Sequence, residues 1–344
     1  MDAFLIFLIT RLTKMNIRIL YFLLMVSLLA MYCKEDAKKQ IVSNKKEELK
    51  LPSFNKDSAF QFVRQQLLFG PRIPNTEAHR KCAAWYVEKF TAYGADVIQQ
   101  KFQAKAFDGT LLNGNNIIAQ INPTAKRRIT LAAHWDTRPW SDADPDPKMQ
   151  KKSFPSADDG PSGVAVLIEL ARIIQTQTLT GIGVDFVLFD LEDYGSESTA
   201  NTDKLKTWGL GSQYWSANLH VSGYRPMYGV LLDMVGGANP GFYTEDYSVY
   251  YAKDIVEKVW SLAASMGYSS FFPRASGDGV TDDHYFVNTI AKIPLIDIIN
   301  RPDGKKFPHY HHTQKDNIDV IDPYTLLMVG KLMTKLIYME NEGL

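Results

Sequence analysis

Acidic and histidine side chains follow three apolar segments of the sequence, at the point where each segment ends. The residues concerned are His134 and Asp136 after the first segment, Glu192 and Asp193 after the second, and Asp233 after the third. Open α/β sheets bind ligands outside the carboxyl ends of their strands, so we expect these side chains to meet at one edge. Adjacent carboxylates such as Glu192 and Asp193 repel each other at a buried edge unless they share a cation or a proton. A single acid after a strand is more often a turn residue, and a salt-bridged loop would also explain the pair.

Two further segments add metal-binding side chains to this set. Asp158 and Asp159 precede a Gly-Pro-Ser-Gly sequence and a predicted helix, so one carboxylate can face the site while the other caps the helix. Three of the seven histidines fall within four residues, at His309, His311 and His312. A solvated histidine-rich loop is the alternative, but together with the acids these residues favour a metal site.

The cysteine count narrows the choice of metal. The chain has two cysteines, which cannot form a thiolate zinc finger or a disulfide scaffold. Histidines combined with carboxylates suit zinc, and catalytic zinc commonly has three protein ligands and one open position. Calcium or magnesium would use oxygen ligands and leave the histidines unexplained. We therefore expect a zinc site.

The overall composition is that of a folded, neutral protein. The 344 residues carry 38 basic and 38 acidic side chains, and 45% of all residues are hydrophobic. A nucleic-acid-binding protein normally has a basic excess on one face, so the balance argues against that class. The charged fraction of 22% and the aromatic fraction of 12% exclude a chain that is disordered throughout.

The N-terminal sequence predicts export. An apolar run from Ile19 to Tyr32 follows Lys14 and Arg18, and it is shorter than the roughly 20 residues of a membrane-spanning helix. Cys33 comes directly after the run and before charged residues, which is typical of a bacterial lipoprotein signal. A simple secretory signal and a retained membrane anchor are the alternatives.

Three segments follow from these patterns. Residues 1–33 are expected to be a signal peptide or lipoprotein signal, 34–53 a charged tether, and 54–344 a single zinc-dependent α/β catalytic domain. The protein should therefore be periplasmic or a cell-envelope lipoprotein, or else secreted, and it should contact a membrane through an N-terminal lipid anchor at most.

Alternating strand and helix patterns predict a three-layer α/β/α sandwich for the domain. The short apolar segments typical of buried central strands are 128–133, 184–190, 227–233 and 293–299. Two further strands are expected at 96–102 and 116–121, with a hairpin signal at Asp108-Gly109 between them. Helices are expected at 58–68, 76–93, 163–177, 211–218, 252–266 and 323–339. The central sheet should thus be mixed and mostly parallel.

The order of these motifs resembles the zinc aminopeptidase superfamily, whose fold is zinc exopeptidase-like. The shared order is His-x-Asp, then Asp-x-x-Ser-Gly, a paired acid after a strand, Leu-Leu-Asp, and a late His-Thr. Within the superfamily, two segments resemble the glutaminyl-peptide cyclotransferases (glutaminyl cyclases). These segments are Thr281-Asp282-Asp283-His284 and Phe307-Pro308 followed by His312-Thr313. The resemblance covers roughly residues 58–340.

The resemblance implies a zinc ion held by Asp159, Asp193 and His312. One zinc per chain is favoured, and two are not excluded. His134 is open as a ligand of a second metal or as part of a hydrogen-bond network.

The resemblance also implies roles for three acids beside the metal. Glu192 would act as general base and general acid. Asp233 would bind the substrate's α-amine and assist proton transfer, with Asp282 hydrogen-bonded nearby.

The sequence departs from the family pattern in the substrate pocket and at one ligand. Asp193 stands where the family commonly has Glu, and His311 where the animal enzymes have Trp. A pocket Trp is missing just after the paired acids, and Trp135, Trp140 and Trp208 are candidates for its place. We expect the substrate pocket to include Phe307, His311 and Trp140.

The resemblance implies cyclisation of the N-terminal glutamine of peptides or proteins to pyroglutamate, with release of ammonia. The first alternative is a zinc aminopeptidase, which removes N-terminal residues and usually holds two metals, for which His134 and Asp233 are available. The second alternative is a non-catalytic binding domain on the same scaffold, which would be expected to have lost ligands.

Overall fold

The computed structural model describes residues 17, 19, 21, 22, 24–28, 49–196 and 204–344. It divides the chain into two units, Met1–Lys50 and Leu51–Leu344. In the first unit, the described residues from 17 to 28 are helical, whereas Cys33 and residues 34–48 of the expected tether lie outside the described part. Among the described residues, no helix is both long and apolar enough to cross a membrane.

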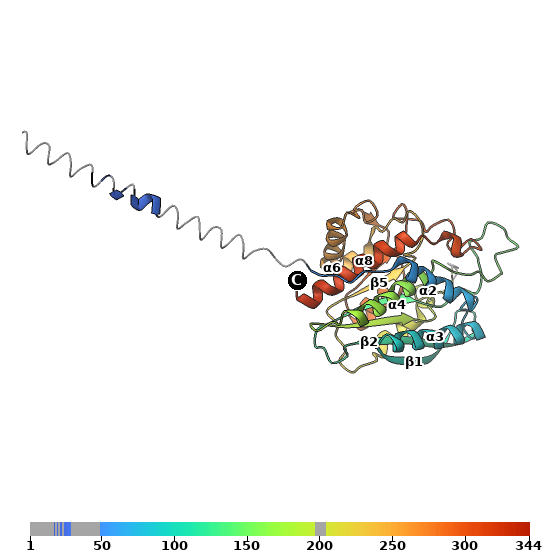
Figure 1. The fold of residues 1–344 in the computed structure, drawn as a ribbon. Helices are drawn as coiled ribbons and strands as arrows, with labels where there is room; N and C mark the ends of the chain where they lie inside the picture. Colours follow the sequence, from blue (N-terminus) through green and yellow to red (C-terminus); the bar gives the residue numbers. More distant parts are fainter. Residues whose placement is uncertain (1–16, 18, 20, 23, 29–48, 197–203) are drawn as a thin grey trace, which may run out of the picture. The chain divides into compact units, whose positions relative to one another are not determined.

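A six-stranded sheet forms the centre of the second unit (Figure 1), with strand order β1-β2-β4-β3-β5-β8. The strands are β1 (Asp96–Lys105), β2 (Leu111–Ile121), β3 (Arg128–His134), β4 (Gly183–Phe189), β5 (Gly229–Asp233) and β8 (Leu295–Ile299). Strands β4, β3, β5 and β8 are parallel to one another. Strand β2 is antiparallel to both of its neighbours. The predicted mixed, mostly parallel sheet is therefore confirmed.

Helices cover both faces of this sheet. They are α2 (Lys56–Leu68), α3 (Glu77–Ala92), α4 (Pro161–Thr176), α5 (Leu210–Ala217), α6 (Asp246–Ser265), α7 (Asp283–Phe286) and α8 (Pro323–Glu342). Adjacent residues of a strand point to opposite faces. On β3, Ala132 packs into a cluster with Trp215 of α5, whereas the Cβ of Ala133 lies beside Gly163 of α4. These contacts give the three predicted layers.

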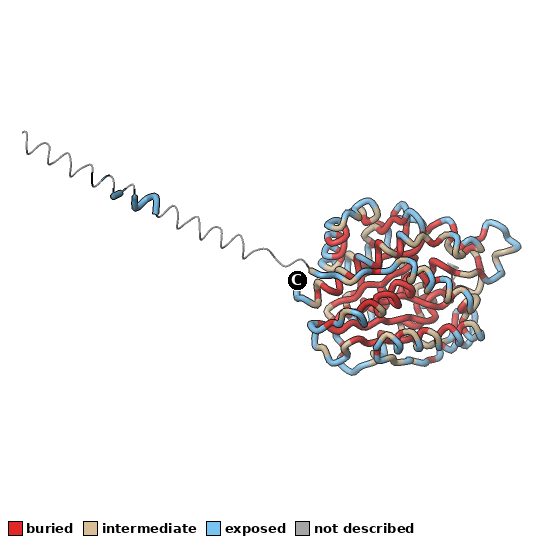
Figure 2. The backbone as a smooth tube through the Cα atoms, viewed as in Figure 1, coloured by how far each residue is buried: buried red, intermediate tan, exposed pale blue. Residues whose placement is uncertain are grey.

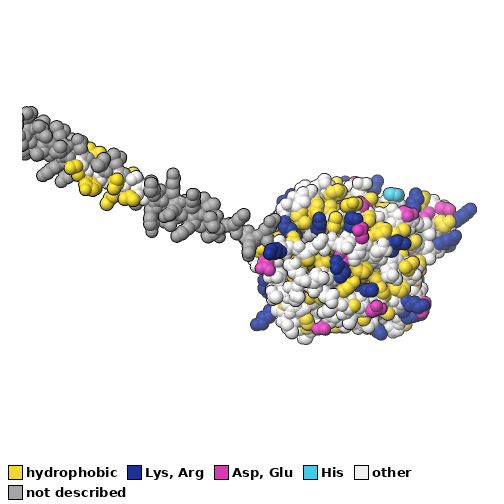
Figure 3. Space-filling view, in the orientation of Figure 1, with side chains coloured by type: hydrophobic (Ala, Val, Ile, Leu, Met, Phe, Trp, Pro, Cys, Tyr) yellow, Lys and Arg dark blue, Asp and Glu magenta, His cyan; other side chains and the backbone are white. Residues whose placement is uncertain are grey.

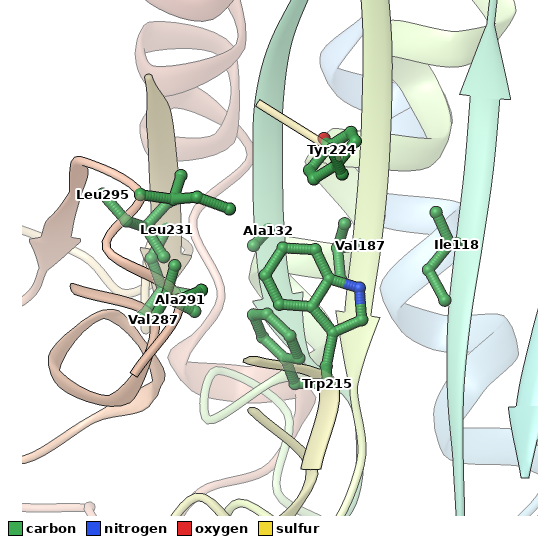
Figure 4. Close-up of a cluster of buried hydrophobic side chains, with 11 residues drawn as sticks. Ile118, Ala132, Val187, Trp215, Tyr224, Leu231, Val287, Ala291 and Leu295 are labelled. Carbon is green, nitrogen blue, oxygen red and sulfur yellow. The ribbon is translucent and has the colours of Figure 1, made fainter. Parts of the chain in front are cut away.

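The core lies on the four parallel strands, every residue of which is buried (Figure 2). Strands covered on both faces are apolar along nearly their whole length, and this is why they were recognisable in the sequence. In the cluster of Figure 4, Ala132, Val187 and Leu231 come from three neighbouring strands and pack with Trp215. On the face of the second unit seen in Figure 3, basic and acidic side chains are interspersed.

Helix α6 begins six residues earlier than the predicted start at Ala252. Its N-cap is Glu245, whose carboxylate accepts hydrogen bonds from the N–H groups of Tyr247 and Ser248. The backbone is non-helical at Ala252, with φ −145° and ψ 44°. The kink interrupts the apolar periodicity of α6, and this is why the sequence predicted the helix to begin only at Ala252.

Candidate active site

Four of the loop segments that form the site at one edge of the sheet each contain a residue with left-handed backbone. These residues are Ser156 (φ 52°), Leu191 (φ 56°), Met234 (φ 50°) and His312 (φ 51°). Non-glycine residues adopt this conformation at a cost, and they keep it where surrounding contacts hold it. Four of the eight non-glycine residues with positive φ in the described part of the chain thus lie beside the residues predicted to carry the chemistry.

Two buried carboxylates hold two of these loops in place, those that contain Leu191 and Ser156. Asp136 accepts hydrogen bonds from the N–H groups of Glu192 (3.0 Å) and Asp193 (3.2 Å). Asp316 accepts from the N–H groups of residues 157–159, at 3.0, 2.8 and 3.3 Å. Both acids are fully buried. Asp316 was not among the predicted site residues, because its partners lie about 160 positions away in the sequence.

The three predicted zinc ligands meet at this edge. His312 Nε2 lies 3.1 Å from Asp193 Oδ1 and 3.5 Å from Asp159 Oδ2. Both oxygens are buried and have no hydrogen-bond partner among the described residues. Zinc bonds of about 2.0–2.2 Å in a tetrahedron place ligand atoms a little over 3 Å apart. The three side chains therefore fit a zinc ion, and its charge would satisfy the two orphaned oxygens.

His134 lies on the other side of Asp159. Its Nε2 is 2.9 Å from Asp159 Oδ1 and 3.3 Å from Asp233 Oδ1, and these three residues form a second group able to hold a metal. Burial would lower the pKa of His134, but its contacts with Asp136, Asp159 and Asp233 outweigh burial and raise the pKa well above its usual value. The geometry thus accommodates either a protonated His134 or, when Nε2 carries no proton, a second metal held by this group.

Three further acids, Glu192, Asp233 and Asp282, line one cavity beside the metal ligands. Burial raises the pKa of Glu192 well above its usual value, and neighbouring carboxylates including Asp282 and Asp193 add to the effect. Burial also raises the pKa of Asp233, to about 7, and that of Asp282. Buried carboxyl groups with raised pKa values can both accept and donate a proton, which suits general acid–base chemistry.

The cavity has a volume of about 300 Å³ and a partly apolar wall. Its lining comprises Asp159, Glu192, Asp193, Leu205, Trp208, Asp233, Gly279, Val280, Thr281, Asp282, Ile299, Arg301, Phe307, His311 and His312. The predicted pocket residues Phe307 and His311 are therefore present, with their rings stacked at 4.1 Å.

The structure places Trp208, not Trp140, in the cavity wall. Trp140 packs edge-on against Tyr194 and Phe107. Trp208 lies parallel to the ring of His312, with centroids 6.4 Å apart. The sequence offered three tryptophans for this role, and nothing in their spacing distinguished Trp208.

Two acids have contacts that differ from, or add to, the predicted ones. Asp158 does not cap α4, whose N-cap Gly160 has no side-chain cap. Its carboxylate instead accepts hydrogen bonds from Gly236 N (2.7 Å) and the Tyr310 hydroxyl (2.6 Å), which draw it away from the helix end. Asp282 lines the cavity and also caps α7 through the N–H of Asp283.

Buried histidine and carboxylate ligands at the carboxyl edge of an α/β/α sheet define a zinc exopeptidase-like protein. The chain belongs to peptidase family M28, whose family model matches residues 116–337. The predicted membership of this superfamily is thereby confirmed.

Solved structures and curated relatives extend the comparison to particular proteins. A glutaminyl cyclase of Bacteroides thetaiotaomicron, solved with N-acetylhistamine, is 45% identical, with a TM-score of 0.81 over 84% of this chain and 99% of that one. A leucine aminopeptidase precursor from the same organism matches with the same identity, coverage and TM-score. The glutaminyl-peptide cyclotransferase of Gloydius blomhoffii is 26% identical over 64% of this chain, and the match spans 63% of its length, less than two thirds. The chain is thus similar to proteins named for both of the predicted activities.

Proposed function

We propose that the protein cyclises the N-terminal glutamine of peptides or proteins to pyroglutamate. The observation that carries the proposal is the group of three buried carboxyls, Glu192, Asp233 and Asp282, around one small cavity beside the metal ligands. Cyclisation requires a proton to leave the α-amine and another to reach the departing nitrogen, and buried acids with raised pKa values can carry both. The 45% identity to a glutaminyl cyclase supports the same activity.

Asp159, Asp193 and His312 would hold one zinc ion per chain. Bound there, zinc would polarise the carbonyl of the substrate's side-chain amide as a Lewis acid. The orphaned oxygens Asp159 Oδ2 and Asp193 Oδ1 support this ligand set.

The protein's acids would carry out the proton transfers. Asp233 holds the α-amine in position for attack on the side-chain amide carbon, which lowers the entropic part of the barrier. Glu192 accepts a proton from the amine as the new C–N bond forms. It then returns a proton to the amide nitrogen as the old C–N bond breaks, and ammonia leaves. Asp282 lines the same cavity, and its charge helps to raise the pKa values of Glu192 and Asp233.

A zinc aminopeptidase is the second candidate function, favoured by the group of His134, Asp159 and Asp233. The two functions predict different products. The protein is incubated with a glutamine-initiated and a leucine-initiated peptide, and the products are analysed by mass spectrometry. Loss of the mass of ammonia from the first peptide supports the cyclase, and removal of leucine from the second would assign the aminopeptidase instead.

We also propose export, with Cys33 lipidated in a bacterial envelope. The apolar run followed by Cys33 supports this assignment. Metabolic labelling with a radioactive fatty acid tests it: label should enter the wild-type chain and be absent from the Cys33→Ser variant. Equal labelling of the two would contradict lipidation.

A further inference from the structure

His312, one of the proposed zinc ligands, is held on several sides by neighbouring side chains. Its ring is stacked on His311, with centroids 3.7 Å apart, and lies parallel to Trp208. Its Nε2 edge faces Asp193, and its other nitrogen, Nδ1, lies 3.6 Å from Asp142 Oδ1. A metal-bound histidine usually gives its second nitrogen to a carboxylate or carbonyl, which fixes the ring orientation and tautomer. Asp142 occupies the place of that carboxylate.

Asp142 is itself held rigidly. Arg138 binds it in a bidentate manner, with Nε 2.9 Å from Oδ1 and Nη2 2.5 Å from Oδ2. Trp140 Nε1 donates a further hydrogen bond to Oδ2 at 3.2 Å. The Arg138 guanidinium is buried and lies 5.0 Å from the ring centres of both Trp140 and Trp208. Because the planar guanidinium is already held by these contacts, it loses little conformational entropy when it binds a carboxylate. It can therefore fix the position of the Asp142 carboxylate.

The same arginine also fixes a second proposed zinc ligand. The backbone N–H of Arg138 donates to Asp193 Oδ2 at 2.9 Å, which leaves Oδ1 turned toward His312. Arg138 Nη1 donates to the carbonyls of Asp193 (2.9 Å) and Gly195 (3.0 Å). Neither Arg138 nor Asp142 lines the cavity. The two residues therefore contact the proposed metal ligands but do not line the cavity in which we propose that the substrate binds.

We propose that Asp142 and Arg138 form a positioning pair for the metal: Asp142 orients His312, and Arg138 fixes both Asp142 and Asp193. The pair sets how tightly the protein holds zinc and takes no part in the proton transfers. This inference rests on the ligand set of the proposed function but not on the reaction itself.

The test is the zinc affinity of full-length variants, measured by competition with a chromogenic chelator. Asp142→Asn should weaken zinc binding by about 10- to 100-fold, the range found when outer partners of metal ligands are removed. Asp146→Asn is the matched control, because Asp146 is an exposed acid of the same loop that accepts a hydrogen bond from Lys148 N. Its affinity should equal that of the wild type.

Two further measurements distinguish a positioning role of Asp142 from a purely structural one. Asp142→Glu keeps a carboxylate and should recover part of the affinity lost in Asp142→Asn. In the cobalt-substituted protein, the visible absorption bands should shift in Asp142→Asn and not in Asp146→Asn, because the bands report the geometry around the metal. Equal zinc affinities for wild type and Asp142→Asn, or for the Asn and Glu variants, would overturn the inference. Failure of the wild type to bind zinc would instead refute the ligand set of the proposed function.

Discussion

Glu192 and Asp193 are adjacent in the sequence, yet their carboxylates have different surroundings. Asp193 is held by Arg138 and turns Oδ1 toward His312, whereas Glu192 lines the cavity with a pKa raised by burial. The left-handed backbone of Leu191 and the anchoring of both N–H groups by Asp136 hold this arrangement. One neighbour can therefore bind metal while the other exchanges protons.

At this scale, Glu192→Gln should retain zinc and lose activity. The amide has nearly the same shape but cannot take up and return a proton, so kcat should fall by about 10²- to 10⁴-fold. Ammonia release from a glutamine-initiated peptide and metal analysis of the same preparation measure both properties. A fully active variant would remove Glu192 from the mechanism.

The histidine-rich loop allows a matched pair of variants. His312→Ala removes a proposed ligand and should abolish zinc binding, because two carboxylates alone bind zinc weakly. His309→Ala changes an exposed histidine three positions earlier and should leave the zinc content unchanged. Metal analysis after dialysis distinguishes the two, and loss of zinc in both variants would argue against this ligand assignment.

At the scale of the elements, the strand ends could be predicted and the contacts that shape the loops could not. Apolar segments ending in acids predicted where β3, β4 and β5 deliver their side chains. The anchoring of residues 157–159 by Asp316 joins parts of the chain far apart in sequence, so no local pattern reveals it. For the same reason, the hydrogen bond from Tyr310 that diverts Asp158 from its expected capping role was not predicted.

Glu245 joins the start of α6 to the segment that carries Asp282. Its carboxylate accepts from Tyr247 N, Ser248 N and Val280 N, and it lies 3.0 Å from His284 Nε2. Burial would raise the pKa of Glu245, but His284 and the N–H donors outweigh burial and lower the pKa to about 2.

Glu245→Gln should therefore destabilise the fold in a pH-dependent way. A carboxyl whose pKa is lower in the folded than in the unfolded state stabilises the fold above its unfolded pKa, near 4.5. That contribution, about 3 kcal/mol at neutral pH, is lost as the pH falls from 4.5 toward 2. Urea unfolding across this range should show that the difference in free energy of unfolding between wild type and variant becomes smaller as the pH falls. A difference that does not change with pH would contradict the assigned ionisation of Glu245.

At the scale of the whole molecule, the layered architecture followed from burial. Strands covered on both faces are mostly apolar, and that property of the four parallel strands is visible in the sequence without any tertiary information. The cavity wall could not be predicted in this way, because its side chains come from several loops that share no sequence pattern. Trp208 and Arg301 are in that wall only because of the tertiary fold: Trp208 was one of three candidate tryptophans that the sequence could not distinguish, and Arg301 was not predicted.

All the proposed metal ligands and acids lie in the unit Leu51–Leu344. A chain that begins at Leu51 should therefore fold, bind zinc and act on glutamine-initiated peptides as the full chain does. Circular dichroism, metal analysis and kcat/KM of the two chains provide the comparison. A truncated chain that folds but is inactive would show that residues 1–50 contribute to the site.

The central claim is that one zinc site carries out cyclisation. The most direct test is to titrate metal-free protein with zinc while following ammonia release from a glutamine-initiated peptide and leucine release from a leucine-initiated one. The account predicts that ammonia release rises in proportion to zinc and levels off at one equivalent per chain, with no leucine released. A plateau at two equivalents accompanied by leucine release, or ammonia release without metal, would contradict it.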